Sequence, residues 1–430
     1  MKKIIVTAVT VIAVAITQPI WSADDQISGD EDSLFNIGTS ADTELVVDID
    51  EEQQPSLEND ALETEGTRIG GSFKMKTANS WLFSKDAGSE SWEVPGLDAG
   101  RLVLDLKAEL FFEARPDSDT KFFGSIKIDG PLAVVEDDAA TLLIDESRGF
   151  DDILKINELF ADFNYRQDIF FRAGKQTIGY GVGYFFSPVD VLSIGKIDLE
   201  DPEAEREGPI ALKTSIPLGL NSLQLFIAAD ESISSVSELS FMPTFDFLRG
   251  NAEIGVGLYY RSDRAPKALL SLSTSIFSDV RLFGEAAIGY GTPAGLSFSE
   301  EDEIFGQLSG GINYSKDLDT DDGFRLWHSS LIVQYLFNFG DPERKELIKM
   351  PGDHYLTYTK RFSDIAGSGI SLSNTGAFNL SDGSKQMLSK LTFDIMDGLE
   401  ISTGVSWLTA ADGAEKLTAT ISANFGSGSF

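Results

Sequence analysis

The chain has 430 residues, no cysteine and a formal net charge of −35 at pH 7. Without cysteine it forms no disulfide and cannot carry the lipidated amino-terminal cysteine of a lipoprotein. The acidic balance also argues against nucleic acid as a partner, because binding nucleic acid requires a basic surface.

The amino terminus has the layout of a cleaved signal peptide. Two lysines precede an apolar run from Ile4 to Ile16, and small residues suited to cleavage stand at Ser22 and Ala23. The run is shorter than the ~20 residues that a membrane-spanning helix needs. We therefore expect residues 1–23 to be removed on export, with a single membrane anchor as the less favoured alternative.

Residues 24–67 form an acidic block, with fifteen Asp or Glu and no Lys or Arg. Like charge and low apolar content predict a disordered periplasmic extension. Two short apolar islands, 34–37 and 45–47, are the places where this extension could contact a partner or the rest of the chain.

From Arg68 onward, apolar and polar residues alternate in successive runs. Side chains along a strand point to opposite faces in turn, so each run predicts a strand with one apolar and one polar face. The run 101–113 is the clearest, because its polar face is ionic. The charges on that face are Asp105, Lys107, Glu109 and Glu113.

A second pair of runs, 154–165 and 169–173, is separated by three residues and predicts a hairpin. Leu159, Ala161, Phe163 and Tyr165 form its apolar face, and the opposite face carries Glu158, Asp162 and Arg172. A strand with one apolar and one charged face cannot lie between two apolar layers. Repeated along a chain behind a secretion signal, the pattern predicts a closed barrel in lipid.

Similar runs recur to the end of the chain and give about eighteen strands if the less regular stretch 237–247, which contains Pro243, is one of them. The expected fold is thus an all-β, transmembrane, antiparallel up-and-down barrel over residues 68–430, with sixteen strands as the alternative. The other runs are 70–83, 121–129, 210–216, 223–229, 252–260, 268–276, 280–290, 304–314, 331–339, 355–362, 369–378, 388–395, 399–407 and 417–425.

The connections between the early runs alternate between short and long, as expected for periplasmic turns and external loops. The long ones are acidic: residues 130–153 hold seven acids and one arginine, and residues 196–207 hold six acids, one lysine and one arginine. A pore with such a mouth should favour cations or neutral solutes.

The signal peptide, the alternating runs and the terminal Phe430 resemble a porin-type bacterial outer-membrane barrel. The segment 171–176, followed by glycine-aromatic residues and then Ser187-Pro188-Val189-Asp190, is similar to a strand and loop of several porin-like families and of uncharacterised barrels from spirochaete-like bacteria. The resemblance implies the outer membrane as location, its lipid and the barrel assembly machinery as partners, and passive diffusion of small hydrophilic solutes. A non-conducting barrel that acts through its acidic loops is the alternative. Oligomeric state and solute are not readable.

Two groups of residues form the expected site. The pore wall is expected to carry the seven charges named above together with Lys175. The connection after residue 176 is long enough to fold back into the bore as a constriction loop, although its aromatic residues would equally suit the interfacial girdle. The loop residues are Tyr180, Tyr184, Phe185, Phe186, Pro188 and Asp190, and Asp190 could pair with Arg172 and Lys175.

Other motifs give weaker hypotheses. His328 and Ser330 stand two apart, as in the His-x-Ser pair of outer-membrane phospholipases, which suggests an esterase as a remote alternative. The acidic stretch 317–323 approaches a calcium loop, but its glycine comes one place late, so a solvated turn is favoured. We therefore expect no catalytic residue, metal or cofactor.

Overall fold

The computed structural model describes residues 66–96, 100–136, 139–142, 154–193, 208–229, 235–262, 264–291, 303–319, 325–340, 352–396 and 398–429, all within one compact unit, Ile37–Phe430. The expected signal peptide, almost all of the acidic extension and Phe430 lie outside these residues. So do most of the two long acidic connections.

Strands make up almost all of the regular structure in the described residues. Two 3-10 helices, η3 (Val236–Glu238) and η4 (Ile365–Gly367), are each three residues long. None of the described helices is long and apolar enough to cross a membrane. The strands are β1 (Gly66–Lys85), β2 (Arg101–Asp117), β3 (Thr120–Glu136), β4 (Ala139–Leu142), β5 (Leu154–Tyr165), β6 (Ile169–Lys175), β7 (Ile210–Leu218), β8 (Asn221–Ala229), β9 (Ser240–Arg249), β10 (Ala252–Arg261), β11 (Arg264–Phe277), β12 (Val280–Gly291), β13 (Glu303–Asp319), β14 (Arg325–Phe339), β15 (His354–Ser363), β16 (Ile370–Asn379), β17 (Lys385–Met396), β18 (Leu399–Thr409) and β19 (Glu415–Ser429).

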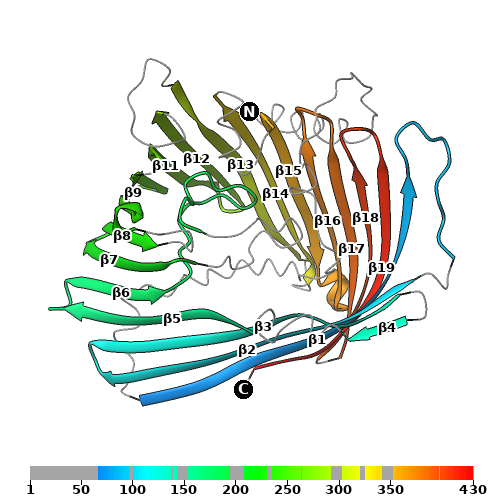
Figure 1. The fold of residues 1–430 in the computed structure, drawn as a ribbon, viewed down its shortest axis with the longest axis horizontal. Coiled ribbons are helices and arrows are strands. Elements are labelled where there is room, and N and C mark those ends of the chain that lie inside the picture. The colour runs from blue at the N-terminus through cyan, green and yellow to red at the C-terminus, as the bar shows by residue number, and fades with distance from the viewer. Residues whose placement is uncertain are drawn as a thin grey trace. The chain divides into compact units, whose positions relative to one another are not determined.

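Eighteen of these strands form a closed antiparallel ring, in which each strand pairs with its neighbours in the chain (Figure 1). The ring closes where β1 pairs with β19, from Ser72↔Ser429 to Lys85↔Glu415. The short β4 lies outside this series and extends β3 as a small hairpin. The eighteen-strand barrel is confirmed. The sixteen-strand alternative is wrong, because the stretch with Pro243 is the paired strand β9.

The outer face of the ring is apolar. Leu102 and Leu110 on β2, and Leu270 and Leu272 on β11, are exposed at 40% or more of their surface, while alternate residues such as Asp105 and Ser271 point inward and are buried. Large apolar side chains exposed on the outside of a closed ring are typical of a barrel that faces lipid.

A charge on this outer face is expected to be costly. Leu225 lies in the middle of β8 and points outward, whereas its neighbour Gln224 points into the ring and lies beside Asp246. Leu225→Arg should lower the free energy of unfolding by about 2–4 kcal/mol in lipid vesicles, the range for arginine near the bilayer midplane. Denaturant unfolding by tryptophan fluorescence measures this, with Gln224→Arg as the matched control. Equal stability of the two variants would contradict a lipid-facing outer surface.

The two rims of the barrel differ. At one rim, here called the turn rim, the connections are only a few residues long, for example residues 278–279 between β11 and β12. The opposite rim, here called the loop rim, carries the longer connections, including the one between β6 and β7, residues 176–209. This division agrees with the expected alternation of short and long connections.

An apolar cluster lies inside the ring, between the connection after β6 and the wall formed by β7 to β12. Ile178, Val189 and Leu192 of the connection pack there. The wall residues of the cluster are Ala211, Phe226, Ala228, Met242, Tyr259, Leu269 and Ala287. The connection is therefore folded inward, and its apolar side chains are what hold it against the wall.

Candidate functional site

The expected pore-wall charges on β2 point into the ring. Lys107 is exposed and Glu109 half-buried, whereas Asp105 is buried at 7% exposure. Near the turn rim, Glu113 accepts a hydrogen bond from Nε of Arg115 at 2.8 Å. The inner face of β2 is therefore charged from Asp105 to Glu109 and again at Glu113, with apolar Val103 and Phe111 on the same face.

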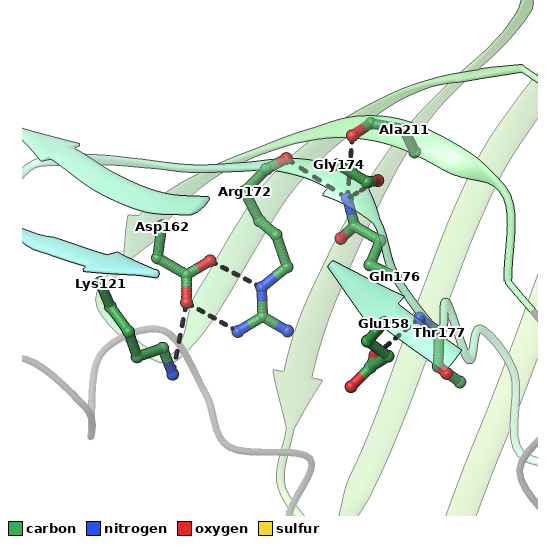
Figure 2. Close-up of polar contacts among 8 residues, drawn as sticks. All are labelled: Lys121, Glu158, Asp162, Arg172, Gly174, Gln176, Thr177 and Ala211. Atoms are coloured by element: carbon green, nitrogen blue, oxygen red, sulfur yellow. Dashed lines mark hydrogen bonds and ion pairs between the residues drawn. The ribbon is translucent and has the colours of Figure 1, made fainter. Parts of the chain in front are cut away.

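Asp162 on β5 forms the centre of a charged group on the inner wall (Figure 2). Arg172 on β6 donates to both carboxylate oxygens, from Nε at 2.7 Å and Nη2 at 2.9 Å, and Lys121 Nζ lies 3.4 Å from Oδ2. The Arg172 guanidinium also stacks over the ring of Phe160 at 3.9 Å. Two cations thus share one carboxylate, and the ring orients the guanidinium.

Removing the carboxylate of Asp162 should make the lumen more selective for anions. In Asp162→Asn, the charges of Lys121 and Arg172 lose their shared counter-ion, so the reversal potential in a KCl gradient should shift toward the chloride value. Asp168→Asn removes the same charge from an exposed turn, where salt screens it over about 10 Å at 0.1 M. A reversal potential that is the same in both variants would contradict a solute path along this wall.

Lys175 does not line the lumen, contrary to expectation. It pairs with Leu159 and Ile210, whose side chains are exposed on the outer face, because a residue three places from Arg172 points to the opposite face. The buried Gln176 points inward and donates from Nε2 to the carbonyl of Ala211 at 3.0 Å (Figure 2).

Glu158 fixes the start of the inward-folded connection. It lies on the inner face of β5, and its Oε1 accepts the backbone N–H of Thr177 at 2.9 Å (Figure 2). The connection therefore turns into the ring directly after β6.

Residues 176–193, here called the inner segment, are anchored to the facing wall by the buried carboxylate of Glu285 on β12. Its Oε1 accepts the backbone N–H groups of Val182 and of Gly183, the latter at 2.7 Å, and its Oε2 accepts the hydroxyl of Ser187 at 2.9 Å. The N–H of Val189 donates to Oε2 at 3.4 Å. One side chain that is 4% exposed thus satisfies four donors of a turn.

Gln334 on β14 is the second anchor. Its Oε1 accepts the N–H groups of Phe185 at 2.7 Å and Phe186 at 3.2 Å, while its Nε2 donates to the carbonyl of Phe186 and to the Ser309 hydroxyl. The amide is fully buried, so its donors and its acceptor are all used. A bidentate amide of this kind fixes both the position and the direction of the backbone.

Two tyrosines extend the anchoring. The hydroxyl of Tyr180 donates to Asp246 on β9 at 3.4 Å, and burial, followed by the charge of Asp246, raises the pKa of Tyr180, so the phenol keeps its proton. Tyr184 accepts a hydrogen bond from Nδ2 of Asn313 at 2.5 Å and packs edge-on against Phe283 at 5.1 Å. The inner segment therefore reaches across the ring to β9, β12 and β13.

The remaining expected loop residues are buried or turn back on the segment. Phe185 is 1% exposed, Pro188 is buried, and the ring of Phe186 lies 5.9 Å from that of Tyr355 on β15. Oδ1 of Asp190 accepts the hydroxyl of Ser193 at 2.7 Å. The expected pairing of Asp190 with Arg172 and Lys175 does not describe the anchoring, because Arg172 binds Asp162 and Lys175 faces outward.

The sequence interpretation missed Glu285, Gln334, Asn313 and Asp246. Each of these residues follows the inner segment by more than fifty residues, so no local pattern links it to the segment. One signal was present: Gln334 interrupts the apolar run Leu331–Phe339, and Glu285 lies among small and apolar residues. A single polar residue on the inner face of an apolar strand indicates a specific partner inside the barrel.

A cavity of about 340 Å³ lies between the tip of the inner segment and the wall near the turn rim. Gly181 to Tyr184 form one side of it. Glu253 on β10, Ser273 on β11 and Arg281 on β12 form the other side. A small solute that passes the segment on this side therefore meets a carboxylate and a guanidinium.

His328 on β14 has a serine partner other than the one expected. Its Nε2 lies 3.2 Å from the hydroxyl of Ser315 on β13, and its Nδ1 lies 2.9 Å from Oδ1 of Asp317. The hydroxyl of Ser330 is buried. The hypothesis of a His328–Ser330 pair is therefore wrong in its serine, because the nearer hydroxyl belongs to the neighbouring strand.

The acidic stretch 317–323 begins in a strand and not in a turn, because β13 continues to Asp319. The side chain of Asp317, near the turn rim, is exposed at 45%. No group of three or more metal-ligating residues occurs in the part of the chain that the structure describes.

Comparisons with known proteins give similarities to solved structures. No protein-family model and no curated protein matches the chain. OccAB4 of Acinetobacter baumannii has a TM-score of 0.47 at 9% identity, with 86% of this chain and 100% of that chain covered. OpdK of Pseudomonas aeruginosa with vanillate has a TM-score of 0.48 at 10% identity, with 84% and 99% covered. A mutant of the Rh. blastica porin has a TM-score of 0.41 at 8% identity, with 83% and 100% covered.

Proposed function

We propose that the chain is a bacterial outer-membrane channel for passive diffusion of small hydrophilic solutes, inserted by the barrel assembly machinery after cleavage of residues 1–23. This proposal rests on the solvent exposure of charged side chains that face the inside of the ring. Lys107 and Glu253 point into a closed ring and are nevertheless exposed. A charge of this kind requires water around it, so the lumen is open to solvent and not filled by a packed core.

The preference for cations or neutral solutes belongs to the same proposal. It rests on the composition of residues 130–153 and 196–207, together with the balance of charges on the wall. On the wall, the cationic groups of Lys121 and Arg172 share the carboxylate of Asp162. The acidic connections should concentrate cations at the mouth of the channel.

Planar-bilayer recording tests this function. The purified full chain should give stepwise conductance in KCl and a reversal potential on the cation side of zero. The alternative, a structural barrel that acts through its acidic loops, gives folded protein without conductance steps. Heat-modifiable gel mobility and far-UV circular dichroism show that the protein is folded, so a silent bilayer would refute the channel and favour that alternative.

Ester hydrolysis is a second candidate function, favoured only by the contacts of His328. Ser315, His328 and Asp317 form the hydrogen-bonded order of nucleophile, base and orienting carboxylate. The Ser315 hydroxyl would attack an ester carbonyl and give its proton to His328, which passes it to the leaving alcohol, and water would release the acid. Fluorophosphonate labelling at Ser315, lost in His328→Ala and retained in His354→Ala, would support this role. An unlabelled wild type would end it.

A further inference from the structure

We propose that the cavity beside the inner segment binds zwitterionic solutes of the size of a short peptide, which carry one ammonium group and one carboxylate. This inference rests on the proposed channel function and names a solute class for it. The cavity volume of about 340 Å³ lies at the lower end of the range for small-molecule sites. The site is therefore suited to a small solute in transit.

The charges of the cavity are arranged for two opposite groups. Glu253 and Arg281 lie on β10 and β12, with β11 between them, and both are the second residue after a turn. Two strand spacings and an offset of two residues along the strands place their backbones about 12 Å apart. Glu253 presents a carboxylate for an ammonium group, and Arg281 presents a guanidinium for a carboxylate, which it can hold with two parallel hydrogen bonds.

The wall between these two charges is polar, because serine side chains of β11 lie there. Ser273 on β11 lies directly opposite Glu253 in the sheet, and its neighbour Ser275 lies opposite Arg281. Both serines are on the inner face, and Ser273 is buried at 8% exposure. Hydroxyls beneath the midpoint of a bound solute can donate to or accept from its peptide groups.

Backbone atoms of the inner segment form the opposite side of the cavity. The turn Gly181 to Gly183 is held at a fixed distance from the wall by Glu285, which accepts the Val182 and Gly183 amides. Gly181 has φ +121°, and a Cβ at this residue would come within 2.4 Å of the Glu285 carboxylate, so only glycine fits. The cavity is thus shaped by a fixed turn, and charge selection is left to Glu253 and Arg281.

The separation of the charges favours a peptide over a free α-amino acid. In an α-amino acid the ammonium and carboxylate groups are attached to the same carbon, whereas the two wall charges are on strands that are not adjacent. A tripeptide such as triglycine can reach both. Its N-acetylated form retains only the carboxylate, its amide form only the ammonium group, and the doubly blocked form neither.

Current blocking in planar bilayers tests the site with these four probes. Triglycine should interrupt the KCl current several-fold more often or for longer than the doubly blocked form at equal concentration. Glu253→Gln should remove the preference for triglycine over the N-acetylated form, and Arg281→Gln should remove the preference for triglycine over the amide form. The exchanged pair Glu253→Arg with Arg281→Glu should restore triglycine blocking, which a merely structural role would not predict.

The outcomes separate this inference from the channel proposal. Absence of any conductance refutes the channel itself. Conductance with equal blocking by triglycine and its doubly blocked form overturns the zwitterion site and leaves the channel intact. Conductance with single variants that behave as wild type also overturns the site, because the two wall charges would then have no part in recognition.

Discussion

Replacing residues 178–207 with a Gly-Ser linker should increase single-channel conductance several-fold and reduce the discrimination between cations and anions. The inner segment contacts the wall from β9 to β15, and these contacts place it across part of the lumen. Its removal should widen the path at this level of the ring. The linker can be short, because the N–H of Gln176 donates to the carbonyl of Pro209 at 3.2 Å.

The replacement also exposes an apolar wall to the lumen, so folding must be checked. Val189 and Leu192 are part of the cluster that covers Phe226 and Met242. Loss of this cover should lower stability, but the ring itself is closed by strand pairing that the replacement leaves in place. Unchanged conductance in a variant with wild-type circular dichroism and heat-modifiable mobility would show that the segment does not restrict the path.

The strands of this barrel could be predicted from sequence because the two solvents on either side of the wall impose a period of two. On β2 every inward position from Asp105 to Glu109 is charged, while Leu102 and Leu110 face outward, so the pattern needs no knowledge of the other strands. Pro243 did not prevent strand formation at β9. Closure and strand count followed from the same local signal.

The errors in the site have two different causes. Lys175 is expected on the pore wall with Arg172, but its position in the alternation places it outside. The anchoring of the inner segment was assigned to nearby charges on β6. The actual anchors, Glu285 and Gln334, are on strands that become neighbours of the segment only when the ring closes. Their role is a consequence of long-range topology.

Glu285→Ala should release the inner segment while the barrel stays folded. The side chain accepts hydrogen bonds from three backbone N–H groups and one hydroxyl, and a buried donor left without its acceptor costs roughly 1–3 kcal/mol. The variant leaves those four donors without their acceptor. We expect open-channel current noise to rise several-fold and brief closures to appear, because a loosened segment moves in and out of the path.

Two variants control this result. Glu109→Ala removes an inward-facing carboxylate from β2, and its current should be as quiet as that of wild type. Glu285→Gln retains one acceptor oxygen, so its noise should lie between those of wild type and Glu285→Ala. Limited proteolysis supplies a readout independent of current: cleavage within residues 178–193 should accelerate most in Glu285→Ala and not at all in Glu109→Ala. If Glu285→Ala were as quiet and as protease-resistant as wild type, Gln334 and the apolar cluster would be sufficient to hold the segment, and Glu285 would not be its main anchor.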